Sequence, residues 1–166
     1  MSKWVEHRVF VPASQTPDPI PEGIAAKYYV CWPGSFHEIT PDNVKRIMKN
    51  LRSGEWMDIY LYHEADEEGD YLDLETDGTL YDLSYGENMG EIWWSTYDPE
   101  YLDSDVETDI IHSDGQSIIY RETTTTDKEA VMTAIEYFIH TGKLWNGIPW
   151  MKRWQELESE KGERAE

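Results

Sequence analysis

The sequence predicts a single α+β domain, in which an antiparallel multi-stranded meander sheet is packed by two main helices at about residues 40–53 and 127–141. The length of 166 residues is close to the commonest size of one domain. Short segments with alternating apolar residues, separated by turn residues, indicate the meander. Two segments instead have apolar residues at helical spacing between capping residues. We expect the domain at 27–151, an N-terminal arm and connector at 1–26, and a charged tail or frayed helix at 152–166.

The chain before the first helix is expected to contain two strands and an irregular connector. Residues 4–11 have the composition of an arm or early strand. Four prolines at 12–21 then favour irregular structure, because proline lacks the N–H that a helix or sheet needs. Residues 27–32 are the next predicted strand, which Pro33 and Gly34 end.

The first helix has a start signal, an apolar stripe and a stop signal. Thr40 is the expected N-cap, and Pro41 takes the first helical position, where its missing N–H does no harm. Gly54 is the expected stop. The residues expected to face the core are Val44, Ile47, Met48 and Leu51.

A series of short strands and turns follows this helix. Asp77-Gly78 is typical of a tight type I′ turn, and Asp114-Gly115 is a second Asp-Gly turn. The predicted strands lie at 57–63, 71–75, 79–85, 92–97, 110–111 and 117–120, and the acidic loops at 64–70 and 98–109.

Alternation assigns the second strand of this meander to two faces. Leu72 and Leu74 are expected to point into the core. Tyr71, Asp73 and Glu75 are then expected to point outward together. The sequence therefore predicts an exposed sheet face that carries both acids and aromatic rings.

The second helix has the clearest local signals. Thr126 to Glu129 form a predicted capping box, and Gly142 is the expected C′ residue. Residues 144–150 return apolar side chains to the core. The buried stripe is expected to consist of Val131, Ala134, Ile135 and Phe138.

The formal charge of −20 resides in one stretch of the chain. Residues 53–120 contain 20 of the 34 acids and no lysine or arginine, whereas the remaining residues have 14 acids and 14 bases. Because this stretch is patterned as a sheet, we expect a folded surface and not an acidic tail. Such a surface favours a cationic partner, and a solvated face that aids solubility is the alternative. Phosphate and anionic lipid would be repelled, so we expect no direct nucleic-acid or membrane ligand.

Three further features favour a cytoplasmic location. The sequence has no apolar run of the roughly 18–20 residues that a membrane span needs. Its first residues lack the apolar core of an export signal. A single cysteine, Cys31, excludes an internal disulfide and fits a reducing compartment.

No catalytic residue, metal site or cofactor is predicted. Asp73 to Gly78 imitates the start of a calcium loop, but Ser84 stands where a bidentate glutamate is needed. The five histidines lack zinc-site spacing, and no nucleophile motif is present. The chain has so many acids that a hydrolytic pair of carboxylates is possible by chance. Such a pair usually needs one acid whose pKa is raised by an apolar pocket, and no acid in the sequence is marked as lying in one. We therefore predict that the protein is not an enzyme.

Aromatic residues lie among the acids and are candidate anchors for a partner. Trp93 and Trp94 are neighbours in a strand, so one is expected in the core and the other on the surface or in a groove. Tyr97 and Tyr101 follow them. Exposed aromatic residues within a polar rim are the composition of interface hot spots.

Two C-terminal motifs resemble the Imm1 family of bacterial immunity proteins. Residues 130–142 read Ala-x3-Ala-Ile-Glu-Tyr-Phe-Ile-His-Thr-Gly and resemble the A-x-x-E-F-hydrophobic-x-T-G helix end of that family. Ile148-Pro149-Trp150 resembles its closing hydrophobic-x-W. The chain departs from the pattern at Tyr137, which is inserted, and at 143–145, where such proteins often have Arg-Pro. The resemblance implies a small α+β protein that neutralises one cognate toxin, often a nucleic-acid deaminase, with nucleases and other effectors also among the partners.

These observations predict an immunity protein that covers the basic substrate groove of a toxin with its acidic, aromatic surface. A monomer in a 1:1 complex is the expected oligomeric state. The alternative is a phage- or plasmid-encoded DNA mimic that inhibits a host nuclease or restriction enzyme. A third interpretation is an adaptor or chaperone for a secreted effector. The predicted toxin-binding residues are Glu64, Asp66, Glu67, Glu68, Asp70, Asp73, Glu75, Asp77, Trp93, Trp94, Tyr97, Asp98, Glu100, Tyr101, Asp103 and Asp105.

Overall fold

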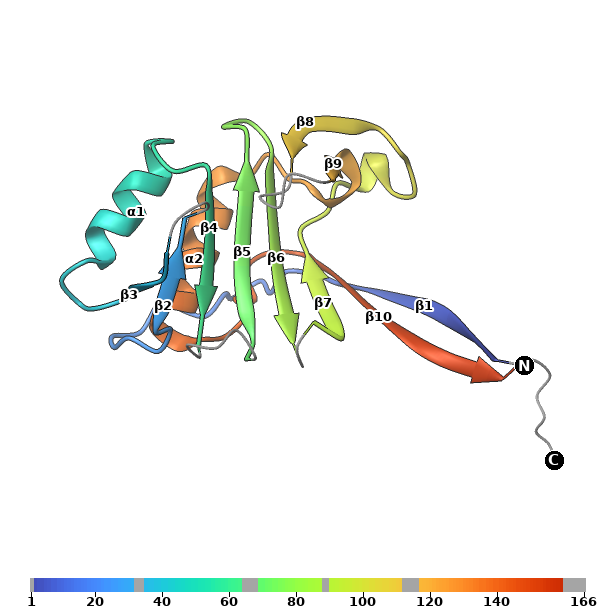
Figure 1. Ribbon diagram of the computed structural model, residues 1–166, viewed down its shortest axis with the longest axis horizontal. Coiled ribbons are helices and arrows are strands. Elements are labelled where there is room, and N and C mark those ends of the chain that lie inside the picture. The colour runs from blue at the N-terminus through green and yellow to red at the C-terminus, as the bar shows by residue number, and fades with distance from the viewer. Residues whose placement is uncertain (1, 32–34, 64–68, 88–89, 112–116, 160–166) are drawn as a thin grey trace.

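The computed structural model confirms a single α+β domain with a large antiparallel sheet (Figure 1). It describes residues 2–31, 35–63, 69–87, 90–111 and 117–159. The elements in chain order are β1 (Ser2–Val11), β2 (Tyr28–Val30), β3 (His37–Glu38), α1 (Val44–Arg52), β4 (Asp58–Tyr62), β5 (Tyr71–Thr76), β6 (Tyr81–Glu87), β7 (Ile92–Ser95), η1 (Pro99–Tyr101), β8 (Glu107–Ile111), β9 (Ile118–Tyr120), η2 (Arg121–Thr123), α2 (Lys128–Thr141) and β10 (Trp150–Ser159).

The eight strands of the main sheet follow the order β1-β10-β7-β6-β5-β4-β2-β3, and each pair of neighbours is antiparallel. The predicted meander is confirmed, because β4, β5, β6 and β7 pair in sequence order. β8 and β9 form a separate two-stranded ribbon, which lies near one end of β6 (Figure 1).

The core lies between the sheet and the two helices. The predicted stripes of both helices are buried and belong to one hydrophobic cluster. Leu72 and Leu74 of β5 are buried in the same cluster, as alternation predicts. The helices therefore cover one face of the sheet and leave the side chains of the other face to form a second surface.

The C-terminal segment is a strand, so the predicted tail or frayed helix is wrong for residues 152–159. β10 pairs along its whole length with β1, and its first residues also pair with β7. The outer part of this two-stranded arm projects from the body of the domain (Figure 1). Both faces of that part are exposed, because the successive residues Glu156 and Leu157, whose side chains point to opposite faces, are both exposed, as are Lys3 and Trp4 on β1. The apolar and polar alternation that reveals a half-buried strand is consequently missing there.

The predicted helix starts differ from the observed ones. Residues 41–43 form a turn, and α1 begins only after Asn43, whose Oδ1 accepts the N–H of Thr40 at 2.9 Å. The predicted N-cap role of Thr40 is therefore wrong. In α2 the cap is Asp127, whose carboxylate accepts the N–H of Ala130 at 3.2 Å, and not the predicted capping box from Thr126. The predicted end of α2 is confirmed, because Gly142 has a left-handed φ of 72°.

The β5–β6 hairpin turns at Asp77 and Gly78, but not through the predicted type I′ turn. That turn needs positive φ at both central residues, and in this connection only Gly78 has it, at 94°. Asp77 Oδ1 instead accepts the N–H groups of Thr79 and Leu80, each at 2.9 Å. The second predicted turn, Asp114-Gly115, lies outside the described residues.

The Asp77→Ala substitution is expected to lower the free energy of unfolding by about 1 kcal/mol, because two backbone N–H groups lose their acceptor. The hydrogen bonds, first that from Leu80, hold the pKa of the Asp77 carboxyl below its ordinary value. A lowered folded-state pKa stabilises the protein above the ordinary carboxylate pKa of about 4 and loses that effect as the pH falls through the lowered value. Urea unfolding at pH 7 and at low pH should therefore show the difference between the two proteins shrinking in acid. A difference that is constant with pH would contradict this role.

Within the part of the chain that the structure describes, no helix combines the length and the apolar content that crossing a membrane requires.

Candidate binding site on the open sheet face

The sheet face opposite the helices carries the side chains that alternate with the core residues. We call this surface the open face. Cross-strand register places its members side by side: Tyr62 opposes Tyr71, and Tyr60 opposes Asp73. The residues of the open face on the five central strands include Asp58, Tyr60, Tyr62, Tyr71, Asp73, Glu75, Asp82, Ser84, Gly86, Trp93 and Arg153.

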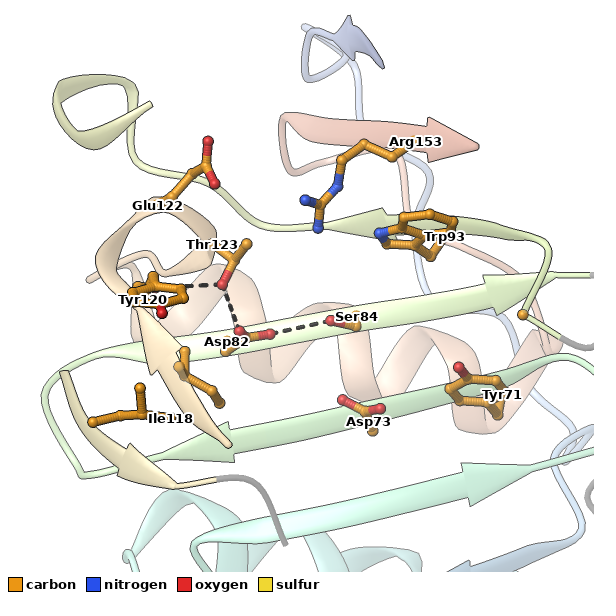
Figure 2. A pocket seen from close by; sticks show the side chains of 12 residues that line it. Tyr71, Asp73, Asp82, Ser84, Trp93, Ile118, Tyr120, Glu122, Thr123 and Arg153 are labelled. Atoms are coloured by element: carbon orange, nitrogen blue, oxygen red, sulfur yellow. Dashed lines mark hydrogen bonds between the residues drawn. The ribbon is translucent and has the colours of Figure 1, made fainter. Parts of the chain in front are cut away.

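A pocket of about 420 Å³ lies on the open face where the β9–η2 segment overhangs it (Figure 2). Strands β5, β6, β7 and β10 supply its floor and one wall, and β9 with η2 supplies the other. The side chains drawn and labelled there are Tyr71, Asp73, Asp82, Ser84, Trp93, Ile118, Tyr120, Glu122, Thr123 and Arg153. We call it the main pocket.

Hydrogen bonds to Asp82 tie the overhanging segment to the floor of the main pocket. Thr123 Oγ1 donates to one carboxylate oxygen at 2.7 Å, and Ser84 Oγ donates to the other at 3.1 Å. Asp82 is only 7% exposed, so a carboxylate there needs such donors. Asp82 therefore fixes the shape of the pocket.

The opposite side of the main pocket has a cation. The Arg153 guanidinium carbon lies 5.5 Å from the centroid of the Trp93 ring. Arg153 Nε is buried and has no hydrogen-bond partner among the described residues. The pocket thus combines an arginine on an indole with the carboxylates of Asp73 and Asp82, an arrangement suited to polar side chains of a partner.

A second hollow of about 270 Å³ adjoins the main pocket and is lined by Tyr60, Tyr62, Tyr71 and Asp73. We call these four residues the tyrosine cage. Tyr71 and Asp73 line both hollows, so they lie at the centre of the open face. Burial, and next the charge of Asp73, raise the pKa of the Tyr71 phenol.

Gly86 allows the Tyr71 ring to occupy its place between the two hollows. A Cβ atom at position 86 would overlap that ring. Because Gly86 has no side chain, the ring of Tyr71 on the neighbouring strand β5 can lie across the β6 backbone at this position.

The structure brings three of the predicted site residues together on the open face: Asp73, Glu75 and Trp93. The predicted orientation of Asp73 and Glu75 is correct, but the expectation that Glu75 is exposed is wrong, since only 3% of it is accessible. Glu75 shares a small pocket of about 180 Å³ with Ile110 and Ile111 of β8. The ribbon thus covers one end of the face, which strand alternation cannot reveal.

Trp93 and Trp94 point to opposite faces, as predicted. Trp94 packs against the core cluster, and its Nε1 donates to Glu87 at 2.5 Å. Lys152 lies 5.0 Å from the Trp94 ring centroid. Trp93, in contrast, lines the main pocket and is the tryptophan available on the open face.

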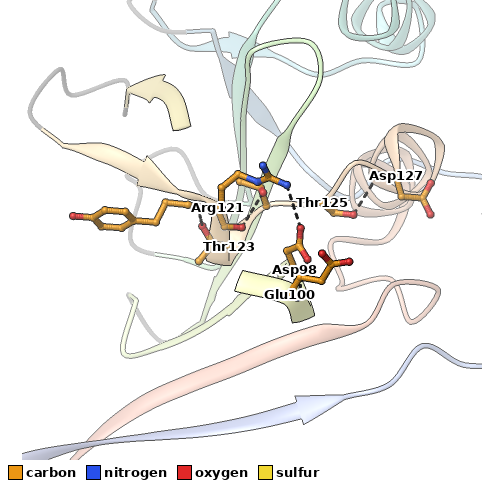
Figure 3. Close-up of polar contacts among 8 residues, drawn as sticks. Asp98, Glu100, Arg121, Thr123, Thr125 and Asp127 are labelled. Atoms are coloured by element: carbon orange, nitrogen blue, oxygen red, sulfur yellow. Dashed lines mark hydrogen bonds and ion pairs between the residues drawn. The ribbon is translucent and has the colours of Figure 1, made fainter. Parts of the chain in front are cut away.

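The predicted acidic loop at 98–109 is largely occupied by contacts within the molecule. Asp98 accepts the N–H of Glu100 at 3.0 Å and lies 3.5 Å from the Arg121 guanidinium (Figure 3). Arg121 in turn lies over the Tyr101 ring, 4.2 Å from its centroid. Asp103 makes hydrogen bonds of 2.8 and 3.2 Å with the Arg8 guanidinium, which lowers the pKa of its carboxyl.

The remaining predicted site residues are dispersed. Tyr97 packs on Phe10 with ring centroids 5.0 Å apart, and Asp70 accepts the Tyr85 hydroxyl at 2.7 Å. Glu100 and Asp105 are exposed, and Asp77 holds the β5–β6 turn. Glu64, Asp66, Glu67 and Glu68 lie outside the described residues.

Sequence reasoning missed several residues of this site. Tyr60 and Asp82 alternate with the buried Ile59 and Leu83, so strand alternation could have identified them. Arg153 could not be found in this way, because the chain after residue 152 has no strand pattern.

One described cluster has metal-ligand chemistry. On the arm, His7 Nε2 lies 2.9 Å from a carboxylate oxygen of Glu156 and 3.4 Å from one of Glu158. The group is far from the tyrosine cage in the strand order, since it involves only β1 and β10. Pairing of β1 with β10, which sets His7 beside the two glutamates of β10, accounts for this group.

Comparisons with protein-family models, curated proteins and solved structures found no match for the chain. The Imm1-like motif residues have structural roles: Phe138 is buried, Gly142 ends α2, and Trp150 is 2% exposed with its Nε1 donating to the Trp145 carbonyl at 2.8 Å.

Proposed function

We propose that this chain is an immunity protein that binds a cognate toxin domain and neutralises it by docking the open face onto the toxin's basic substrate groove. The observation that carries the proposal is the open face itself: two adjoining hollows place aromatic rings beside carboxylates, in a chain with a formal charge of −20. The resemblance of the second helix and Trp150 to the Imm1 family supplies the class of partner, a deaminase or nuclease acting on nucleic acid.

Charge and aromatic rings contribute to such binding in different ways. An immunity protein needs nanomolar affinity or better, which corresponds to about −12 kcal/mol. Long-range attraction raises the association rate but seldom supplies that free energy in water. Tyr71 and Trp93 add apolar area at the centre of the face, where buried anchors contribute most. No catalytic step by this chain is part of the proposal.

The internal ion pairs favour an immunity protein over the DNA-mimic alternative. A mimic of the DNA backbone has to offer its carboxylates to the enzyme at the positions of phosphates. In the described acidic loop, Asp98 and Asp103 are instead paired with Arg121 and Arg8. Binding through a hollowed aromatic face agrees better with recognition of one specific protein.

Co-expression with the product of the adjacent gene tests the proposal. We expect the two proteins to purify together, and the partner to lose its deaminase or nuclease activity on addition of one equivalent of this chain. A partner that binds and stays fully active would contradict the inhibitory role and favour an adaptor. If this chain inhibits unrelated host nucleases and the adjacent gene does not encode a toxin, the DNA-mimic alternative would be favoured.

A further inference from the structure

We infer that the tyrosine cage binds one cationic side chain of the partner, an arginine whose guanidinium stacks on the rings and pairs with Asp73. The identity of that partner as a toxin rests on the proposed function, whereas the chemistry of the cage does not. The open face then binds one specific ligand group, in addition to the general attraction between opposite charges.

The cage is built on two neighbouring strands. Tyr60 and Tyr62 project from β4, and their ring centroids lie 6.4 Å apart with the planes inclined by 22°. Tyr71 projects from β5 opposite Tyr62, and these two centroids lie 6.3 Å apart. Asp73, opposite Tyr60, completes the hollow. Strand pairing therefore fixes the spacing of all four side chains.

Three aromatic rings, of which that of Tyr62 is 7% exposed, and one carboxylate select a cation. The face of an aromatic ring is negative, so it attracts a cation within about 6 Å of the centroid. A guanidinium is flat, weakly hydrated and able to stack, and it matches a carboxylate with two parallel hydrogen bonds. The charge of Asp73 disfavours an anion in this hollow and favours a cation.

The molecule already pairs arginine with aromatic rings at several places. The Arg121 guanidinium lies 4.2 Å from the Tyr101 centroid while it approaches the Asp98 carboxylate to 3.5 Å. This internal group has the three components that the cage would form with a partner: a guanidinium, a tyrosine ring and an aspartate. The same combination of groups therefore already occurs elsewhere in this molecule, between η1 and η2.

A titration with a small probe tests the cage without any partner. Nα-acetyl-arginine amide is added to the ¹⁵N-labelled protein at constant ionic strength, and Nα-acetyl-citrulline amide serves as the neutral probe of the same shape. We expect the amide signals of residues 60, 62, 71 and 73 to shift with saturation, with a dissociation constant of about 1–10 mM for a single side chain. The citrulline probe should give no saturating shift at these residues.

Two variants locate the effect. Asp73→Asn keeps the shape of the side chain and removes its charge, and it is expected to weaken arginine binding about tenfold. Glu55→Gln, in the exposed loop after α1, removes one charge from the same acidic stretch and should leave the affinity unchanged. Unchanged signals elsewhere in the spectrum confirm that each variant is folded.

Several results would overturn the inference: no saturating shift at the cage, equal shifts with the citrulline probe, or equal affinity of the wild type and the Asp73→Asn variant. Failure of the proposed function has a different signature, because the arginine probe would still bind while no co-expressed toxin is inhibited. Inhibition of a toxin without binding of the probe would instead reject the cage and leave the proposed function intact.

Discussion

Replacing Gly142 with alanine is expected to lower the free energy of unfolding by about 3 kcal/mol, because two costs add at this position. Gly142 ends α2 with a φ of 72°, and its N–H donates to the Phe138 carbonyl at 2.7 Å. An alanine in this left-handed conformation costs about 1–2 kcal/mol. Its Cβ would also overlap the imidazole of His63, which packs edge-on against the Phe138 ring with centroids 5.9 Å apart. Urea unfolding measures the loss.

Gly54→Ala is the matched control for this prediction. Gly54 also follows a helix, has a φ of 79° and donates to the Leu51 carbonyl, but a Cβ there would meet no atom within 4 Å. We expect this variant to lose only the backbone cost of about 1–2 kcal/mol. Adding His63→Ala to the Gly142→Ala variant should recover part of the difference. Equal losses in the two glycine variants would show that His63 does not confine Gly142.

The Asp73→Arg substitution is expected to weaken binding of the cognate partner by about 100-fold or more. Asp73 lines both hollows of the open face, so the new guanidinium would face the partner's cationic groove from the centre of the interface. Like charges brought together in an interface cost several kcal/mol, and about 2.7 kcal/mol already corresponds to 100-fold. Surface plasmon resonance should show most of the change in the dissociation rate.

Glu55→Arg makes the same change of net charge in the loop after α1, where the side chain is exposed. It is expected to slow association only a few-fold, and this effect should vanish as the salt concentration rises. If Asp73→Arg and Glu55→Arg weaken binding equally, binding depends on the net charge of the chain and not on contacts with the open face. Thermal unfolding of each variant separates a loss of binding from a loss of structure.

Much of the fold follows from local sequence patterns. The stripe of Val44, Ile47 and Leu51 and the alternation of Leu72 with Asp73 reflect the repeat of one helix or one strand against a core, so they are visible in the sequence. The opposite orientations of two neighbouring tryptophans have the same origin. The helix caps were less predictable, because several oxygen-bearing residues compete at each helix start.

The remaining features depend on contacts between distant parts of the chain. Arg8 pairs with Asp103 across 95 residues, so the sequence offers no sign that this acid is already engaged. Glu75 is buried because β8 reaches the end of β5, a contact outside the pattern of either strand. β10 escaped prediction because much of it belongs to an arm exposed on both faces. Among the described residues, several acids are therefore engaged within the molecule, so their number overstates the acidic surface that they offer to a partner.

A crystal structure of the complex with the cognate partner tests the central claim most directly. Docking through the open face predicts that Tyr71, Asp73 and Trp93 are buried at the interface, with an arginine of the partner between the rings of the tyrosine cage. A partner bound to the helix layer, with these three side chains still in contact with solvent, would contradict the account.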